Sequence, residues 1–198
     1  MKPYKYLAGL AMATLTLSGC TNLDETVYDQ ISSNNYFNTK EDVIAMAFRS
    51  FEHGYWTIVP RFRIQELPGD QLIIPRRDGS WDDGGVWRQF HYHTWTPDIA
   101  RHVHDEWDSC FAGIGQCNFA IDRFSELGPA KFGFSEEEFN SLRTQNRVLR
   151  CWYYIRLLDA FRNVPFSVSY DDPSKNSMAQ VPPEFIFNFV ETELKESI

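Results

Sequence analysis

Residues 76–95 bring together side chains of types that can contact a sugar. The set contains three tryptophans, two arginines and two aspartates, namely Trp81, Trp87, Trp95, Arg76, Arg77, Asp82 and Asp83. Indole rings stack on the apolar faces of sugar rings, while sugar hydroxyls accept hydrogen bonds from arginine and donate them to aspartate. The alternative is that the tryptophans pack this segment onto neighbouring helices. Because Trp81 is flanked by charged residues and glycine, we expect it to face solvent.

Two His-x-His pairs suggest a different chemistry. They are His91 with His93 and His102 with His104, and aspartates lie close to both pairs in the sequence. In an extended chain the two imidazoles of a pair project to one side and can bind zinc, so a zinc-dependent hydrolase is the rival hypothesis. If residues 101–104 begin a helix, however, His102 and His104 point about 200° apart and cannot bind one ion together.

Known sequence signatures of catalysis are missing. The sequence has no H-E-x-x-H motif, no G-x-S-x-G motif, no phosphate-binding glycine loop and no C-x-x-C motif. Glu136, Glu137 and Glu138 are explained by the start of a helix, where the helix dipole favours carboxylates. We therefore expect no catalytic residue, no metal site and no cofactor.

The N-terminal residues follow the order of segments found in a secretion signal. Lys2 and Lys5 precede an apolar run from Leu7 to Leu17, which is too short to span a bilayer, and small residues then lead to Cys20. The sequence predicts a lipoprotein signal peptide at 1–19, acylation of Cys20 and a membrane-attached tether at 20–38; the alternative is an ordinary signal followed by a chance cysteine.

The net charge of −8 and the lack of a basic stripe argue against a nucleic-acid partner.

The rest of the chain has the periodicity of amphipathic helices. We expect one mainly α-helical domain at 39–198, with helices at 39–54, 105–127, 135–161 and from Pro183 onward. Between the first two, Pro60–Pro97 reads as a long ordered loop with one short strand at 71–74. The apolar face of the first helix is predicted to comprise Val43, Ile44, Ala47, Phe51 and Tyr55. Because the last helix runs into Ile198 without a glycine cap, we expect a truncated domain.

Polar residues within the helices have simple predicted roles. Thr39 with Asp42, and Ser135 with Glu138, have the spacing of capping boxes. Cys110, Cys117 and Cys151 are odd in number, so buried free thiols are expected, with one bridge to Cys151 as the alternative. We expect Arg143, Arg147, Arg150 and Arg156 to pair with acids on neighbouring helices or to cover the core.

Short motifs follow one another in a recognisable order. They are Leu17-Ser18-Gly19-Cys20, Tyr36-Phe37-Asn38-Thr39, Glu66-Leu67-Pro68-Gly69-Asp70, Pro75 to Gly85, His91 to Pro97, Trp107 with Ile114 and Asn118, Leu142-Arg143 to Arg150, Tyr153-Tyr154, and Asn163-Val164-Pro165. In their order and spacing, the motifs make the chain resemble the N-terminal part of the SusD/RagB-like outer membrane lipoproteins of the Bacteroidetes.

This resemblance implies a fold of tetratricopeptide-like helical pairs with long inserted loops. It also implies a non-catalytic role at the cell surface, in which the protein captures an oligosaccharide or related nutrient and passes it to a SusC-like TonB-dependent transporter. A purely structural envelope scaffold, whose tryptophan loop binds a protein, is a further alternative.

Overall fold

The structure is a computed structural model that describes residues 37–81, 83–96, 101–172 and 178–198. All of these residues belong to one compact unit, Phe37–Ile198. The predicted signal peptide, Cys20 and all of the predicted tether except residues 37 and 38 lie outside the described residues, as does Asp82.

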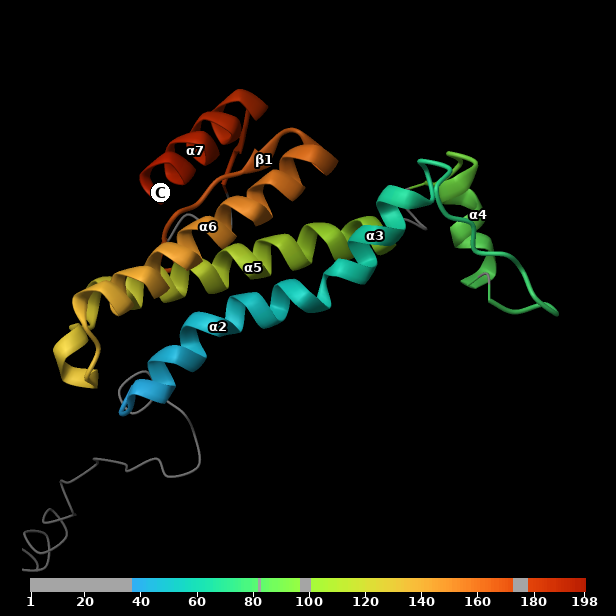
Figure 1. Cartoon of the computed structure of the whole chain (residues 1–198). Coiled ribbons are helices and arrows are strands. Elements are labelled where there is room, and N and C mark those ends of the chain that lie inside the picture. Colours follow the sequence, from blue (N-terminus) through green and yellow to red (C-terminus); the bar gives the residue numbers. More distant parts are fainter. Residues whose placement is uncertain (1–36, 82, 97–100, 173–177) are drawn as a thin grey trace, which may run out of the picture. The chain divides into compact units, whose positions relative to one another are not determined.

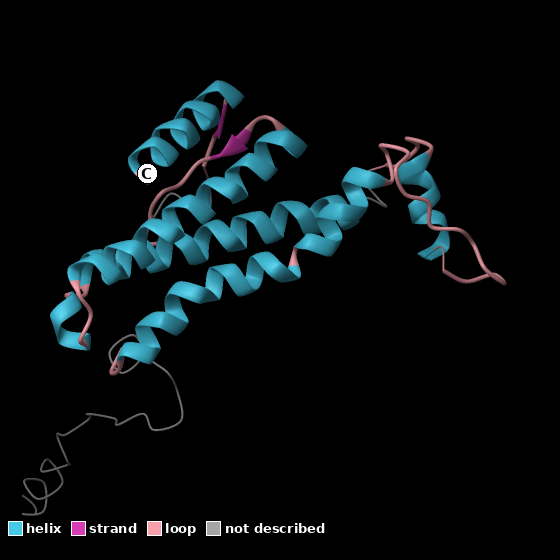
Figure 2. Ribbon diagram, in the orientation of Figure 1, coloured by secondary structure: helices cyan, strands magenta, loops and turns pink. Residues whose placement is uncertain are grey.

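Helices dominate the unit, as predicted (Figures 1 and 2). They are α2 (Lys40–Trp56), α3 (Ile58–Glu66), α4 (Val86–His91), α5 (Arg101–Glu126), α6 (Glu136–Phe161) and α7 (Pro183–Glu196), with short 3-10 turns at Asp83–Gly85 and Pro129–Phe132. Two short strands, β1 (Val164–Pro165) and β2 (Gln180–Val181), pair antiparallel before α7. Among the described residues, none of these helices is long and apolar enough to cross a bilayer.

Both predicted capping boxes are present. The Thr39 hydroxyl accepts a hydrogen bond from the backbone N–H of Asp42, whose carboxylate accepts one from the N–H of Thr39. Ser135 and Glu138 repeat this reciprocal arrangement at the start of α6. Each box satisfies backbone donors that have no partner within the helix, and so fixes where the helix begins.

The prediction of a loop through Pro60–Pro97 was wrong in part, because α3 and α4 lie within it. Pro60 is the third residue of α3, a position in the first turn where a missing N–H breaks no helical hydrogen bond. Residues 71–74 form no strand, and the nearest ladder contact is an isolated bridge between Arg77 and Ser80. Helix α5 also begins four residues earlier than expected, at Arg101.

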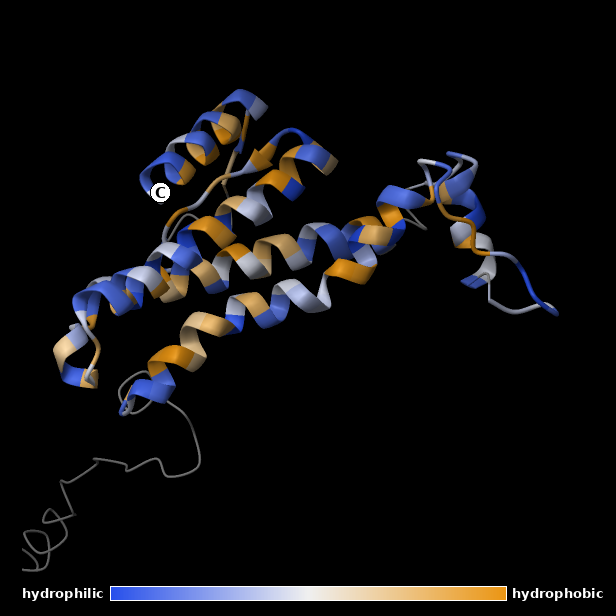
Figure 3. Ribbon diagram, in the orientation of Figure 1, coloured by the Kyte–Doolittle hydropathy of each residue, from blue (hydrophilic) through white to orange (hydrophobic). Residues whose placement is uncertain are grey.

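The main core lies where α5 and α6 pack along each other, with α2 against both and α7 on α6. Its fully buried side chains include Ile114, Tyr153, Tyr154, Leu157 and Ile186. Figure 3 shows that apolar positions alternate with polar ones along these helices. Tyr153 sets the α5–α6 spacing: a Cβ built at Gly113 would lie 2.2 Å from its ring, so only glycine fits there.

The face that α2 buries differs from the predicted one. Its buried residues are Val43, Met46, Ala47, Ser50 and Gly54. Phe51 is only partly buried, and Tyr55 is 72% exposed. The small residues allow close packing on α5 and α6, so the large apolar residues are left on an adjacent, open face.

Buried polar groups tie the helices together, as predicted for three of the four arginines. Arg156 of α6 donates from Nε and Nη2 to the fully buried Glu106 of α5, at 2.9 and 2.6 Å. Arg147 and Arg150 both donate to Glu193, at 2.8 Å at the closest, and hold α7 on α6.

The three described cysteines, Cys110, Cys117 and Cys151, are buried and free, as predicted.

Candidate functional site

A second, smaller core supports the segment that carries the predicted sugar contacts. Leu67, Trp87 and Phe90 are buried together, with Val103 of α5 packed against them. This core connects the end of α3, the short α4 and the start of α5. It therefore holds the described residues of the segment 67–96, which include α4, between α3 and α5 (Figure 1).

Trp87 belongs to this core and is only 3% exposed. Its indole N–H donates to Asp83 Oδ2 at 2.8 Å, and its ring stacks on His102 with centroids 4.3 Å apart. The Arg63 guanidinium lies 4.9 Å from the centroid of the Trp87 ring. Trp87 therefore presents no open face to a ligand and packs the segment onto the helices, which is the alternative raised for the tryptophans. Asp83 positions it.

Trp81, in contrast, is 65% exposed, in line with the expectation that it faces solvent. It follows a tight turn in which Arg77 and Ser80 exchange backbone hydrogen bonds of 3.0 and 2.8 Å, with Asp78 and Gly79 both at positive φ. The Arg77 guanidinium lies 5.1 Å from the centroid of the Trp81 ring. Trp81 itself has φ of 74°, a left-handed conformation that is unusual for an aromatic residue and is often found at functional positions.

Trp95 is also exposed but is supported from beneath. Its ring stacks on the buried Phe90 at 5.5 Å and lies 5.5 Å from the ring of His93. His93 Nε2 donates to the carbonyl of Pro68 at 2.9 Å, so the support is anchored at the end of α3. Trp95 is therefore held in place with part of its surface free.

Tyr92 is an exposed aromatic residue outside the set of residues predicted from the sequence. It is as exposed as Trp81, and its ring contacts His91 edge-on at 5.0 Å. It directly follows α4, and this position after a short helix is what leaves it outside the core. Arg76 is exposed and has contacts of its own.

The structure thus divides the predicted set. Arg77 and Trp81 are in contact at the turn; Asp83 and Trp87 form a buried support; Trp95, with Tyr92 nearby in the chain, offers aromatic surface after α4. We call Trp81, Tyr92 and Trp95, with Arg77, the aromatic surface of the 67–96 segment.

Among the described residues, neither histidine pair belongs to a group that could hold a metal ion. His102 and His104 both lie within α5, where their side chains diverge. His91 Nδ1 lies 3.3 Å from Asp70, and His93 is engaged with Pro68. Throughout the described ranges, no group of three histidine, cysteine or acidic side chains is arranged to hold a metal ion.

Comparison with known proteins places the fold. No protein-family model and no curated protein sequence matches the chain. Three solved structures that match are a laminarin-binding SusD-like protein, a SusD superfamily protein from Parabacteroides distasonis and a SusD-like protein from Bacteroides fragilis. Their TM-scores are 0.64, 0.64 and 0.67, and their sequence identities are 20%, 17% and 16%, in that order. The matches cover 82%, 85% and 87% of this chain and 34%, 34% and 32% of the respective neighbour. The chain spans about a third of the length of these proteins. Its helical arrangement is that of a SusD-like fold.

Proposed function

We propose that the protein is a non-catalytic binding protein that captures an oligosaccharide through the aromatic surface of the 67–96 segment. The observation that carries this proposal is the exposed Trp81 ring, held on an ordered turn beside the Arg77 guanidinium. An indole face and a neighbouring donor match the two kinds of surface that a sugar ring presents. The SusD-like fold supports the same role, since one structural neighbour binds laminarin.

Trp81, Tyr92 and Trp95 would contact successive parts of the ligand. Large aromatic side chains that are already fixed lose little conformational entropy when a ligand binds. The stack of Trp95 on Phe90 and the hydrogen bond of His93 fix one ring, and the turn at Arg77–Ser80 fixes another. Arg76 and Asp82 are proposed to supply further polar contacts.

We further propose that the protein is anchored in the outer membrane, at the cell surface, through acyl chains on Cys20, and that it delivers its ligand to a SusC-like TonB-dependent transporter. The lipobox at Leu17–Cys20 and the fold support this placement. Several acyl chains are sufficient for stable attachment of a water-soluble domain.

The test is binding of Trp81→Ala to a glycan array that includes laminarin oligosaccharides, using the acylated lipoprotein. Trp56→Ala is the matched control, because Trp56 is similarly exposed, at 69%, but lies on α2. Losing one stacking contact should weaken binding about tenfold or more, whereas the control should bind normally. If Trp81→Ala keeps its glycans but loses association with the transporter, the segment serves a scaffold and capture is refuted.

A further inference from the structure

Backbone conformations that are unfavourable for residues with a Cβ are concentrated in the 67–96 segment. Among the described residues, six non-glycine residues have positive φ: Asp70, Asp78, Trp81, Asp83 and His93 in this segment, and Arg162 after α6. Aspartate tolerates this conformation because its short polar side chain can form local hydrogen bonds. Histidine and tryptophan need support from surrounding contacts to stay there, and such residues are often found at functional positions.

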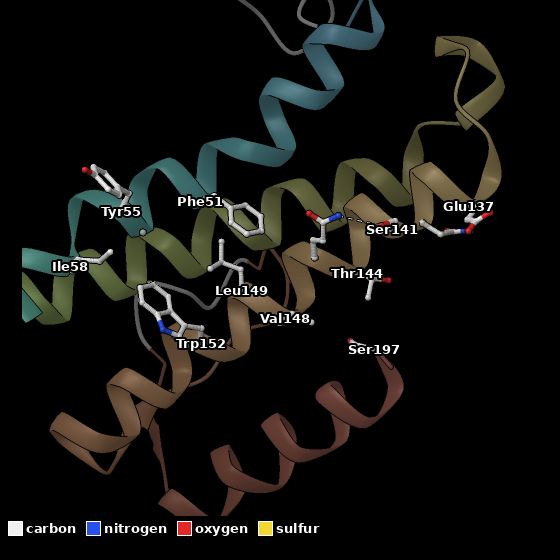
Figure 4. A pocket seen from close by; sticks show the side chains of 13 residues that line it. Phe51, Tyr55, Ile58, Glu137, Ser141, Thr144, Val148, Leu149, Trp152 and Ser197 are labelled. Atoms are coloured by element: carbon white, nitrogen blue, oxygen red, sulfur yellow. Dashed lines mark hydrogen bonds between the residues drawn. The ribbon is translucent and has the colours of Figure 1, made fainter.

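The hollow between α2 and α6 does not account for these conformations. It is lined by residues such as Phe51, Leu149 and Trp152, and by none of the described residues of the 67–96 segment (Figure 4). The explanation must therefore come from contacts within the segment itself.

His93 occupies the position at the end of α4 that favours glycine. The N–H of His93 donates to the carbonyl of Phe90 at 3.2 Å, and the N–H of Thr94 donates to the carbonyl of Gln89 at 2.9 Å. These two hydrogen bonds make a Schellman motif, whose left-handed residue is His93, with φ of 56°. Glycine is the usual residue at this position because it has no Cβ. A histidine here therefore makes the helix end less stable than glycine would.

The imidazole of His93 makes two contacts that glycine could not make. Its Nε2 lies 2.9 Å from the carbonyl oxygen of Pro68. Because a carbonyl oxygen only accepts, Nε2 carries the proton and donates it. The imidazole centroid also lies 5.5 Å from that of Trp95, which stacks on the buried Phe90 as well. His93 therefore connects the Trp95 ring to the turn that follows α3.

The other histidine of the pair faces the same turn. His91 Nδ1 lies 3.3 Å from Asp70 Oδ1, two residues after Pro68. The His91-x-His93 pair, which the sequence suggested as a zinc site, thus joins the end of α4 to residues 68–70. All of these contacts are internal to the helical unit.

We propose that His93 is a positioning residue for Trp95, and that its imidazole fixes the indole in the orientation that binds sugar at the expense of a less stable helix end. This role rests on the proposed function, since it requires that Trp95 contacts the ligand. An aromatic side chain that is already fixed loses little conformational entropy on binding. Removal of the imidazole should therefore weaken binding although His93 itself does not touch the sugar.

Fluorine NMR of the full chain labelled with 5-fluorotryptophan tests the positioning directly. The chain has six tryptophans, and the resonances that disappear in Trp95→Phe and Trp107→Phe identify these two. In His93→Gly we expect the Trp95 resonance to shift or split, while that of Trp107, which packs on the main core, stays in place. The midpoint of urea unfolding should change little, because relief of the helix end offsets the lost hydrogen bond.

Two other side chains at this position separate the hydrogen bond from the backbone conformation. Asparagine tolerates positive φ, but its amide is too short to reach the Pro68 carbonyl, so His93→Asn should behave like His93→Gly. Glutamine is longer by one methylene and can place an N–H near the position of the histidine Nε2, so His93→Gln should restore part of the Trp95 signal. Arg162→Gly is the matched control, because it also removes a side chain from positive φ after a helix, and it should leave the Trp95 resonance unchanged.

Binding of laminarin oligosaccharides separates the role of His93 from the proposed function. Trp95→Ala and His93→Gly should each weaken binding about tenfold, whereas Arg162→Gly should bind normally. Loss of binding in Trp95→Ala but not in His93→Gly would overturn the positioning role and leave the proposed function standing. Normal binding by Trp95→Ala would overturn both the contact of Trp95 with sugar and the role of His93 in it.

The NMR result decides the role of His93 independently of the ligand. If the unmodified chain binds no laminarin oligosaccharide, the proposed function is weakened, but the Trp95 resonance still reports on the positioning. An unchanged Trp95 resonance in His93→Gly would overturn the proposal whether or not a glycan binds.

Discussion

The buried ion pair between Glu106 and Arg156 offers a sharp test of how the helices are held together. Arg156 makes two hydrogen bonds to the Glu106 carboxylate and a third, of 2.6 Å, from Nη1 to the Thr57 hydroxyl at the α2–α3 junction. Its guanidinium also lies 4.6 Å from the centroid of the Trp152 ring. One side chain of α6 therefore links α5 and the α2–α3 junction and also contacts Trp152 of its own helix.

Arg156→Met keeps most of the apolar stem but removes these donors. Glu106, fully buried, would retain the weak hydrogen bond from the Cys110 thiol, at 3.5 Å, and the more distant Arg61, whose Nη1 lies 3.7 Å away. Removing one partner of a buried ion pair costs about 3–5 kcal/mol, and the remaining arginine favours the lower end of that range. For a domain of this size, about 3 kcal/mol lowers the thermal midpoint by roughly 6–12 °C.

Urea unfolding, followed by tryptophan fluorescence and by circular dichroism, measures this change. The double variant Glu106→Leu/Arg156→Met should recover at least about half of the loss, because no charge then stays buried without a partner. Arg49→Met is the control: it breaks only the exposed pair with Glu52 and should cost less than about 1 kcal/mol. A loss below about 1 kcal/mol for Arg156→Met, or simple addition of the two single effects in the double variant, would refute this account of the pair.

Three further predictions concern the packing, the acid stability and the thiols of the helical unit. Gly113→Ala should destabilise the helical unit by about 1–3 kcal/mol or more in urea unfolding, because the new Cβ collides with the Tyr153 ring. Gly115→Ala is the control on the same helix, where no atom lies within 4 Å of the new Cβ, and it should be neutral or stabilising by up to about 1 kcal/mol. Burial alone would raise the pKa of Glu193, but hydrogen bonds and charge from Arg147 and Arg150 lower this pKa overall. The stability that Glu193 adds is therefore present above its ordinary pKa of 4.5 and is lost as the pH falls through the lower folded pKa. Hydrogen exchange in α7 should rise in that pH window, and it should rise less in Glu193→Gln. Burial raises the pKa of the thiols of the three core cysteines to between about 11 and about 12, so they should resist alkylation at pH 8 until urea is added, and rapid labelling of the native protein would contradict this.

Much of the helical framework could be predicted because its signals are local. Thr39–Asp42 and Ser135–Glu138 mark helix starts through contacts within four residues. The predicted pairing of arginines with acids was confirmed for Arg147, Arg150 and Arg156, although the sequence could not name their partners. Glu106 lies 50 residues from Arg156, and nothing in its local sequence distinguishes it from an exposed glutamate.

The residues predicted to contact a sugar could not be divided into exposed and buried ones from the local sequence. Trp81 and Trp87 are both tryptophans near acids and glycine, yet one is exposed and the other is buried. The difference arises because Val86–His91 forms a helix that turns Trp87 and Phe90 onto Leu67, a contact between segments about 20 residues apart. Composition could identify the segment as aromatic, but only its packing against α3 and α5 separates supporting side chains from free ones.

The first helix shows why its buried face was predicted wrongly. Helical spacing placed Phe51 and Tyr55 on the same face as Val43 and Ala47, as one apolar stripe. In the folded unit α2 has two adjacent apolar faces. One consists mostly of small residues, ends at Gly54 and packs against α5 and α6, while the other includes Phe51 and Tyr55 and is more open. An amphipathic pattern reports how much of a helix is apolar but not how many neighbours cover it. Because the large residues are on the more open face, the packing of α2 against the core depends on Ala47, Ser50 and Gly54 more than on Phe51 and Tyr55.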